Sequence, residues 1–391
     1  MTDATEVPRE APEPPLPLDG IRVIEFTHMI MGPTCGMILA DLGAEVIKIE
    51  PPGGDRTRKL PGLGIGFFRT FNRNKKSVVL DITTPEGRDA ATALIADADV
   101  VLENFRPGLM RSLGLDYATL SQRFPRLVYA SHKGFLPGPY EHRVALDEVV
   151  QMMAGLAYMT GPPGRPLRAG ASVNDIMGGM FGAIGILAAL LERRRTGRGQ
   201  EVQSAPFENC VFLVASHMQQ FSMTGEVPRP FPTRFSPWSV YDVFTLADGE
   251  QLFIGAVNDK QFQVLCRVLD APELANDPAL ATNEQRVHAR PDLLARLGAI
   301  LVRHRAADLA AKLEAAGLPY APIARPDQLL DDPHLRASGG LATMQTEEGP
   351  TDVVPLPLTL DGRRLGVRMP LARTGEHNDE VLGARPKRTD P

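Results

Sequence analysis

The sequence predicts an α/β protein: an open, Rossmann-like parallel-sheet large domain plus a smaller α+β domain. Two observations predict this fold. Apolar runs rich in β-branched residues alternate with helical patterns through the first half of the chain. A proline-rich segment at 226–237 then precedes a hairpin pattern and several helical stretches. The length of 391 residues allows two or three domains of ordinary size.

The first strand–helix–strand unit is predicted from three consecutive segments. The apolar run at 21–27 predicts a buried strand, and the segment at 34–43 predicts a helix that ends at Gly43, after a loop. A second apolar run at 44–50 predicts the next strand. Because two strands joined by a helix usually pair in parallel, this unit indicates a parallel sheet covered by helices.

The same alternation continues to about residue 223. Further strands are expected at 76–82, 100–105, 127–135 and 201–205. The helices expected between and after them lie at 84–98, 108–124, 147–159, 176–191 and 206–223. Thr83 or Thr84 is a candidate cap for the first of these helices, since Pro85 suits a first helical turn.

The second half of the chain predicts the smaller domain. Two apolar runs flank an Asp248-Gly249 turn, which indicates a hairpin, and helices are expected at 259–270, 290–304 and 306–316. A further strand is expected at 320–324, and the segment after it holds a short helix and a β-rich stretch. We therefore expect a disordered tail at 1–17, a first large-domain segment at 18–225, a linker at 226–237, the small domain at 238–325 and a return segment at 326–391 that completes the large domain.

The composition bounds the class of protein. Hydrophobic residues make up 43% and charged residues 23%, which is typical of a soluble globular protein. A net charge of −5 and few aromatic residues argue against a nucleic-acid partner. We expect no signal peptide and a cytoplasmic location. We also expect no membrane partner, since the apolar run at 176–191 is short for a membrane span. Cys35, Cys210 and Cys266 are scattered, which predicts free thiols.

Several common catalytic motifs are missing from the sequence. It contains no G-x-G-x-x-G, no P-loop, no G-x-S-x-G and no H-E-x-x-H pattern. The eight histidines show no metal-ligand spacing, so no metal site is predicted. These patterns argue against a nicotinamide dehydrogenase and against a serine hydrolase.

An acidic residue stands at the start of the apolar helix expected at 176–191. The segment 171–179 reads ASVNDIMGG. Asn174 or Asp175 could cap the helix by accepting a free backbone N–H group of its first turn. Asp175 could instead be a nucleophile that faces a cleft. Since caps are common and catalytic acids are rare, this segment alone favours the cap.

Seven phrases in order along the chain resemble the class III CoA-transferases. They are IRVIEFTHMIMGP, GAEVIKIEPPGGD, FNRNKKSVVLDI, DVVLENFRPG, ASHKGF, GILAALLERRRTGRGQ and GEHNDEVLG, between about Leu18 and Gly383. The resemblance implies an open α/β large domain, a smaller domain and an obligate homodimer of interlocked subunits. It also implies a coenzyme A thioester as substrate, a carboxylic acid as its partner and no permanently bound cofactor.

The resemblance also assigns a role to Asp175. The family nucleophile is an aspartate just before the apolar helix that ends in TGRGQ, and Asp175 holds that place. This role implies an aspartyl anhydride and an aspartyl-CoA thioester as intermediates, in a site that excludes water. We expect the helix N-terminus to keep the carboxylate ionised at neutral pH. With the resemblance, nucleophile is favoured over plain cap, and the two roles are compatible.

Coenzyme A brings three phosphates, which require cations and backbone donors. The positions where the family gathers its CoA contacts hold His28, Arg73, Lys75, Lys76, Asn104, Phe105, Arg106, Arg111 and Lys133. The residues themselves leave a simpler interpretation open. A lysine and arginine cluster on a loop is often a solvated face, and His28 could be an ordinary loop histidine.

Departures from the family pattern bear on the reaction. Racemases of the same superfamily place a histidine before the acid of a GHD phrase, whereas Leu146 precedes Asp147 here, so CoA transfer is favoured over proton exchange. Ile30 stands where formyl-CoA transferase has a glutamine, and the segment TRFSPWSV lacks the glycines of its covering loop. Both differences argue against formate and oxalate as substrates.

The substrate is expected to be a pair of small dicarboxylic acids. Arg56, Arg58 or Arg234 could hold a second carboxylate, although exposed arginines are usually only solvated. Ile30 and Asp147 are further candidate substrate contacts, and Asp147 could equally be the cap of a surface helix. Two other functions stay open: an acyl-CoA racemase or epimerase of the same fold, and a non-catalytic CoA-binding protein.

Overall fold

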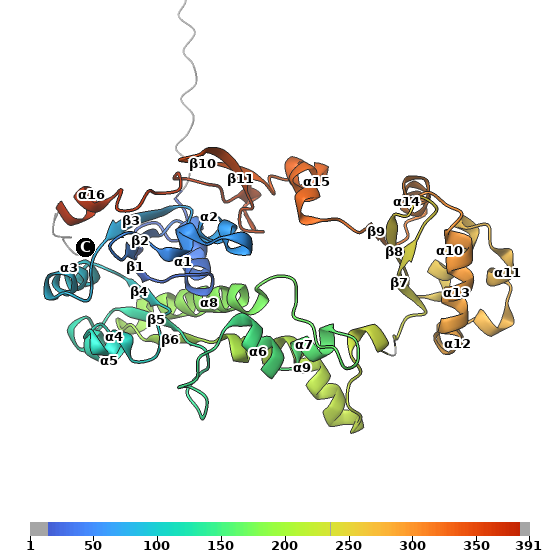
Figure 1. The fold of residues 1–391 in the computed structure, drawn as a ribbon, viewed down its shortest axis with the longest axis horizontal. Helices are drawn as coiled ribbons and strands as arrows, with labels where there is room; N and C mark the ends of the chain where they lie inside the picture. The colour runs from blue at the N-terminus through green and yellow to red at the C-terminus, as the bar shows by residue number, and fades with distance from the viewer. Residues whose placement is uncertain (1–14, 235, 384–391) are drawn as a thin grey trace, which may run out of the picture. The chain divides into compact units, whose positions relative to one another are not determined.

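The structure is a computed structural model that describes residues 15–234 and 236–383 (Figure 1). The described residues form two compact units, one within 1–232 and 333–391 and the other within 233–332. The first boundary falls inside the proline-rich segment at 226–237. Most of the expected disordered tail, residues 1–14, lies outside the described residues. Leu16 is described, and it packs against the core of the first unit, so the tail prediction is wrong at this residue.

The first unit is built on a six-stranded sheet in which each neighbouring pair of strands is parallel. In spatial order the strands are β3 (Lys75–Val79), β2 (Glu45–Glu50), β1 (Arg22–Phe26), β4 (Val100–Glu103), β5 (Val128–His132) and β6 (Glu201–Ser204). The predicted Rossmann-like parallel sheet is confirmed. The chain order reverses between β1 and β4, and open α/β sheets hold ligands at the carboxyl ends of the strands at such a point.

Two helical layers cover the two faces of this sheet (Figure 1). Helices α1 (Met31–Asp41) and α8 (Val173–Thr196) pack on one face, where Leu39 and Ile186 belong to the same apolar core. Helix α3 (Pro85–Ala96) packs on the other face through Ala91 and Ile95. The other helices of the first unit are η1 (Arg56–Lys59), η2 (Gly62–Gly66), α2 (Phe67–Phe71), α4 (Leu109–Ser112), α5 (Tyr117–Arg123), α6 (Asp147–Met153), α7 (Leu156–Thr160), α9 (Pro206–Thr224) and η3 (Phe231–Thr233).

Local sequence explains where two of these helices begin. The hydroxyl of Thr84 accepts the N–H of Gly87, so Thr84 is the cap of α3, with Pro85 in the first turn as expected. Helix α1 begins at Met31, three residues earlier than the predicted start at 34. Pro33 was assigned to the loop, but a first turn tolerates proline because the missing N–H has no partner within the helix there.

Helix α8 is the structural centre of the first unit. Among the described residues it is a helix long and apolar enough to cross a membrane, by length and composition. In this fold it packs on α1 and on strands β5 and β6, so its apolar composition is also explained by a helix that packs in the core. It ends at Gly197, whose φ of 71° is left-handed, after three arginines that complement the helix dipole.

The second unit matches the predicted α+β pattern. Strands β7 (Val240–Thr245) and β8 (Gln251–Ala256) form the expected antiparallel hairpin, and β9 (Tyr320–Pro322) joins them. Gly249 in the turn has a φ of 79°, which glycine adopts easily. The helices are α10 (Asp259–Val268), α11 (Pro272–Ala275), η4 (Pro278–Leu280), α12 (Asn283–His288), α13 (Arg290–Leu301), α14 (Ala306–Ala315) and η5 (Pro326–Asp331), of which α11, η4 and α12 were not predicted.

The last part of the chain returns to the sheet of the first unit. It contains α15 (Pro333–Ala337), β10 (Ala342–Thr346), β11 (Gly349–Val353), β12 (Thr359–Leu360), β13 (Arg363–Arg364) and α16 (Asn378–Gly383). Near its end, the ring of His377 accepts the N–H of Ser77, and the Asn378 side chain accepts the N–H of Val79. These bonds satisfy donors along β3, the strand at the edge of the sheet.

Candidate active site

Asp175 lies in the first turn of α8, and a second acid holds this end of the helix. Oδ2 of Asp147, in α6, accepts the backbone N–H groups of Asn174 at 2.9 Å and of Asp175 at 3.2 Å. Within the described chain, the N-cap residue Ser172 makes no capping bond through its side chain. The prediction that Asn174 or Asp175 caps the helix is therefore wrong. The cap is supplied by Asp147, from a different helix.

Asp147 is itself held from three sides and is only 4% exposed. Its Oδ1 accepts a hydrogen bond from the side chain of Gln151, one helical turn along α6. Gln151 in turn accepts the N–H of Ala169, on the segment that leads into α8. The guanidinium of Arg168 contacts Glu148 as an ion pair and lies 3.9 Å from Asp147. The interpretation of Asp147 as the cap of a surface helix is thus wrong, since it is buried and caps α8.

These acids change the protonation of Asp175. Burial, together with the negative charges of Asp147 and Glu148, raises the pKa of Asp175 to about 7, and Arg168 opposes this shift. The expectation that the helix N-terminus keeps Asp175 fully ionised at neutral pH is therefore wrong. The first-turn N–H groups are already bonded to the carboxylate of Asp147, so its negative charge offsets the field of the helix N-terminus at Asp175.

Glycines allow α8 to lie unusually close to its neighbours. A Cβ atom at Gly179 would be 2.7 Å from the carbonyl oxygen of Met31 in α1. A Cβ atom at Gly182 would be 2.2 Å from the ring of His132, at the end of β5. His132 is buried, and burial lowers its pKa to about 3, so the ring is neutral. The expected close packing of the glycine-lined helix is confirmed, and it fixes the start of α8 against the sheet.

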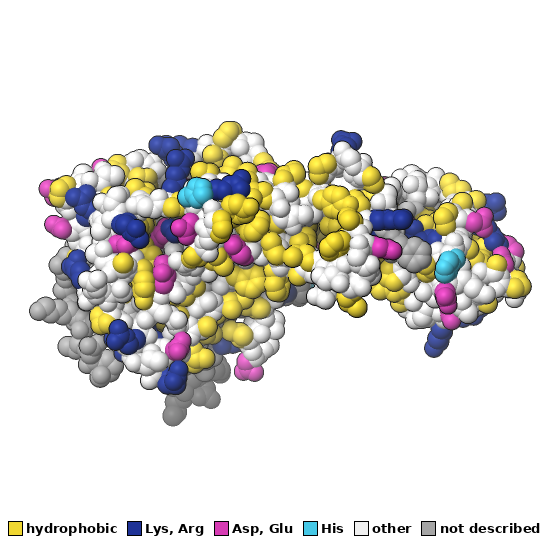
Figure 2. Space-filling model, turned by 90° about the horizontal axis from the view of Figure 1, so that it is seen from below, with side chains coloured by type: hydrophobic (Ala, Val, Ile, Leu, Met, Phe, Trp, Pro, Cys, Tyr) yellow, Lys and Arg dark blue, Asp and Glu magenta, His cyan; other side chains and the backbone are white. Residues whose placement is uncertain are grey.

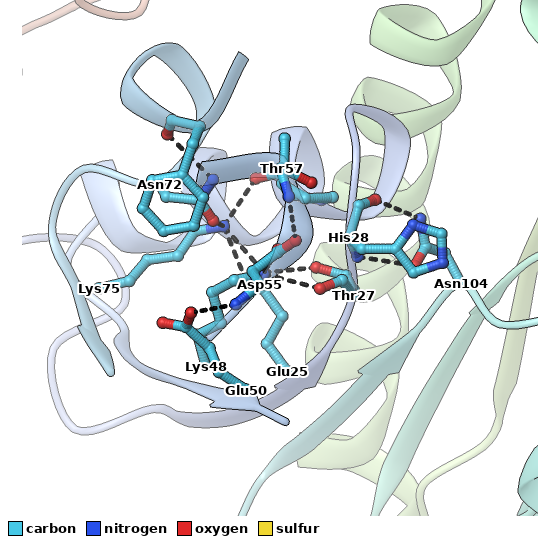
Figure 3. A network of polar contacts seen from close by, with 12 residues as sticks. Glu25, Thr27, His28, Lys48, Glu50, Asp55, Thr57, Asn72, Lys75 and Asn104 are labelled. Atoms are coloured by element: carbon cyan, nitrogen blue, oxygen red, sulfur yellow. Dashed lines mark hydrogen bonds and ion pairs between the residues drawn. The ribbon is translucent and has the colours of Figure 1, made fainter. Parts of the chain in front are cut away.

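The loops after β1 and β4 meet at the point where the strand order reverses. The Asn104 side chain accepts the N–H of His28 at 3.0 Å and donates to the His28 carbonyl at 2.8 Å (Figure 3). The rings of His28 and Phe105 lie 5.8 Å apart between centroids. Three of the predicted CoA-binding residues are therefore brought together, at the edge where this fold is expected to hold a ligand.

A buried polar network fixes the loop that carries His28 (Figure 3). Lys48 donates to the Thr27 carbonyl at 2.7 Å and forms an ion pair with Asp55 at 3.0 Å. Asp55 accepts the N–H of Thr57, and the Thr57 hydroxyl accepts the N–H of Met29 at 3.1 Å. Met29 has a φ of 64°, which is uncommon for a residue with a side chain. The network holds this loop in a conformation that it would otherwise rarely adopt.

The basic cluster at 73–76 is part of the protein interior. Arg73 forms a 2.6 Å ion pair with Asp41, and Lys75 forms a 2.9 Å ion pair with Glu25. Both side chains are 2% exposed, and burial lowers the pKa of Lys75 to about 8. A phosphate cannot reach side chains placed in this way, so the prediction that Arg73 and Lys75 bind CoA is corrected. The alternative of a solvated face is equally wrong for these two residues.

The other predicted CoA contacts have different surroundings. Lys76 forms ion pairs with Glu45 and Glu380 and is mostly buried. Lys133 forms an ion pair with the buried Glu103. Arg106 and Arg111 are exposed, and Arg111 lies 3.6 Å from Asp116.

Of the predicted substrate contacts, Asp147 bonds to the backbone of Asp175, and the others have partners or positions of their own. Ile30 is 3% exposed, and its carbonyl accepts bonds from Thr34 within α1. Arg58 forms a 2.6 Å ion pair with Glu50 and stacks on Phe68, while Arg56 is exposed. Arg234 belongs to the second unit. A role for Ile30, Arg56, Arg58 or Arg234 in substrate binding stays a prediction.

Sequence reasoning missed three residues of this site: Glu148, Gln151 and Arg168. Arg168 is the cation that acts on Asp175, and Gln151 ties Asp147 to the segment before α8. Polar residues spaced by four, Asp147 and Gln151, within an otherwise apolar stretch were the available signal. Among the described residues, no group of three or more His, Cys, Asp or Glu side chains could hold a metal ion.

Fold and site together define an α/β protein that places a carboxyl group in the first turn of a long helix packed against its sheet. The family model of CoA-transferase family III matches residues 18–378, and the chain belongs to this family. It is 34% identical to a succinate–glutarate CoA-transferase of Agrobacterium fabrum, over 97% of each chain. It is 39% identical to an acetyl-CoA:oxalate CoA-transferase of Acetobacter aceti, over 83% of each chain.

Solved structures agree with this assignment. A CaiB/BaiF family protein from Brucella suis matches with a TM-score of 0.85 and 33% identity, over 95% of this chain and 99% of that one. The chain is therefore a CoA-transferase, and CoA thioesters are the substrates of its family. The predicted family membership is confirmed.

Proposed function

We propose that this enzyme moves CoA from an acyl-CoA to a free carboxylic acid through covalent intermediates on Asp175. The observation that supports this most is the position of Asp175 in the first turn of α8, half-buried and within the field of Asp147, Glu148 and Arg168. A carboxylate is a sufficient nucleophile for a thioester once it is ionised, and no base is needed to activate it. Burial also limits the access of water to an activated acyl group.

The proposed reaction proceeds by two exchanges. Asp175 attacks the thioester carbonyl and expels CoA thiolate, which leaves a mixed anhydride between Asp175 and the acyl group. The thiolate attacks the aspartyl carbonyl and releases the donor acid, which leaves an aspartyl-CoA thioester. The acceptor carboxylate then attacks this thioester, and the expelled thiolate attacks the acceptor carbonyl of the new anhydride. The products are the new acyl-CoA and free Asp175.

Coenzyme A is proposed to lie across the loops after β1 and β4. His28, Asn104 and Phe105 meet there, and Arg106 and Arg111 provide exposed cations for phosphates nearby along the chain. Lys133 and Lys76 remain candidate contacts of the same kind, each reached by exchange of an ion-pair partner.

A homodimer is proposed as well. Exposed apolar side chains follow one stripe of α8: Met180, Ile184, Leu187 and Leu191. Helix α9 adds further exposed apolar side chains, including Phe212, whose ring lies 5.6 Å from Phe181 of α8. The space-filling view shows hydrophobic side chains over much of one face (Figure 2). Apolar surface of this extent favours a partner, and the family suggests a second copy of the chain.

The substrates are proposed to be small carboxylic acids, dicarboxylic acids in particular, because relatives are named for succinate, glutarate and oxalate. Because one of these relatives is named for oxalate, oxalate is included as a candidate substrate, although Ile30 argued against it in the sequence. The test is a matrix of acyl-CoA donors against free acids, with each product acyl-CoA identified by mass spectrometry. New acyl-CoA that depends on both substrates supports transfer. Exchange of an α-hydrogen without any acceptor acid would support a racemase instead.

A further inference from the structure

Arg168 is the cation at the entrance to α8. It lies on the segment between α7 and α8, with a side chain 27% exposed. Its Nε donates to the Ala169 carbonyl at 2.9 Å, and its Nη1 donates to Glu148. Its Nη2 lies 3.9 Å from Asp147 Oδ1, which is too long for a hydrogen bond. Among the described residues, Nη2 therefore interacts with Asp147 through charge and without a hydrogen bond, and its two N–H groups can still donate to a ligand.

The chemistry at this site creates a need for such a cation. Asp147, Glu148 and Asp175 are three acids close together, and the first two already raise the pKa of the third. A free carboxylic acid enters this site as an anion, and a dicarboxylic acid brings two negative charges. Without a positive partner, the second carboxylate would be repelled by the acids around it. A guanidinium suits this task because it pairs with a carboxylate through two parallel N–H bonds.

We propose that Arg168 binds the second, non-reacting carboxylate of a dicarboxylic acid during CoA transfer. This inference rests on the proposed function. The reacting carboxylate must lie against Asp175 itself. Arg168 lies beside Asp147, and Asp147 accepts the backbone N–H of Asp175, so the cation is one residue removed from the proposed nucleophile. Such a cation matches a carboxylate at the far end of a short carbon chain.

Glu148 is the partner that the substrate replaces. Its side chain is 51% exposed, so it can turn into water when a substrate carboxylate takes Arg168. An ion pair in this setting contributes little to stability, and its loss is a small penalty on substrate binding. Asp147, which is buried and bonded to α8, stays in place during the exchange. Removing Arg168 should therefore weaken the binding of a dicarboxylic acid, and removing the charge of Glu148 should strengthen it.

The test compares glutarate with butyrate as acceptors, with succinyl-CoA as the donor at saturation for each enzyme. Arg168→Met should raise the KM for glutarate by about tenfold to a hundredfold, the loss expected for a charge-assisted contact. The KM for butyrate, which has no second carboxylate, should change by less than about twofold. Glu148→Gln should lower the KM for glutarate, since the competing carboxylate is removed. Arg168→Lys should restore part of the lost affinity, because a charge returns without the paired N–H geometry.

Three results would overturn the inference. If Arg168→Met raises the KM values for glutarate and butyrate equally, the arginine only tethers the segment before α8. If Glu148→Gln raises the KM for glutarate as much as Arg168→Met does, the site depends on the ion pair between the two residues and not on a contact between Arg168 and the substrate. If the wild-type enzyme transfers CoA to butyrate and not to any dicarboxylic acid, the inference fails while CoA transfer stands. Absence of transfer to every acid would instead overturn the proposed function. Thermal unfolding of each variant checks that the fold is retained.

Discussion

The carboxylate of Asp147 accepts the N–H group of Asp175, so one acid fixes the backbone of the other. The same oxygen accepts the N–H of Asn174, which places a negative charge directly at the start of α8. This arrangement fixes the backbone at Asp175 and also opposes ionisation of its side chain. The proposed nucleophile is therefore a carboxyl group that is held in place and is partly protonated near neutral pH.

The first prediction concerns the pH dependence of turnover. Only ionised Asp175 can attack, so kcat/KM for the acyl-CoA should rise as the pH increases through about 7 and level off above it. Asp147→Asn removes a negative charge that raises this pKa, so the rising limb should move to lower pH. Asparagine keeps an oxygen that can accept the N–H groups of α8. Glu148→Gln should move the limb in the same direction by less. A limb that stays in place in both variants would contradict this electrostatic account.

The second prediction separates interior cations from surface cations. Lys75→Ala removes the 2.9 Å ion-pair partner of the buried Glu25 and leaves it the longer contact of 3.6 Å with Lys48, so the free energy of unfolding should fall by about 3–5 kcal/mol. Arg106→Ala removes an exposed cation, so stability should change little while the KM for acyl-CoA rises about tenfold. Urea unfolding and steady-state kinetics measure the two effects. A stable Lys75→Ala enzyme with a raised KM would restore the CoA-binding role that the structure argues against.

The strands and helices of the large domain were accessible from sequence because they depend on local patterns. Several strands are short apolar runs, such as 44–50, and two helices have a recognisable start at Thr84 or a recognisable end at Gly197. Short elements without periodicity, such as α11 and α12, carry no such pattern and were missed. The start of α1 was misplaced because Pro33 is compatible with both a loop and a first turn.

The site was harder to predict because its contacts join distant positions. The partner of Lys75 is Glu25, fifty residues earlier, and the partner of Arg73 is Asp41. A lysine and arginine cluster looks the same in sequence whether it faces water or such buried acids. The capping of α8 by Asp147 spans 27 residues, and no local rule connects them. The pKa of Asp175 depends on this arrangement, so it could not be predicted before the packing was known.

The central claim is that Asp175 carries the acyl and CoA groups in turn. The most direct test treats the enzyme with hydroxylamine while it turns over succinyl-CoA, and then maps the modified peptide by mass spectrometry. Hydroxylamine attacks activated carboxyl groups, so Asp175 should become a hydroxamate only when acyl-CoA is present. The account predicts this modification at Asp175 and its absence in Asp175→Asn, with acyl-CoA binding retained. Modification of another acid, or turnover with no modification at Asp175, would contradict the account.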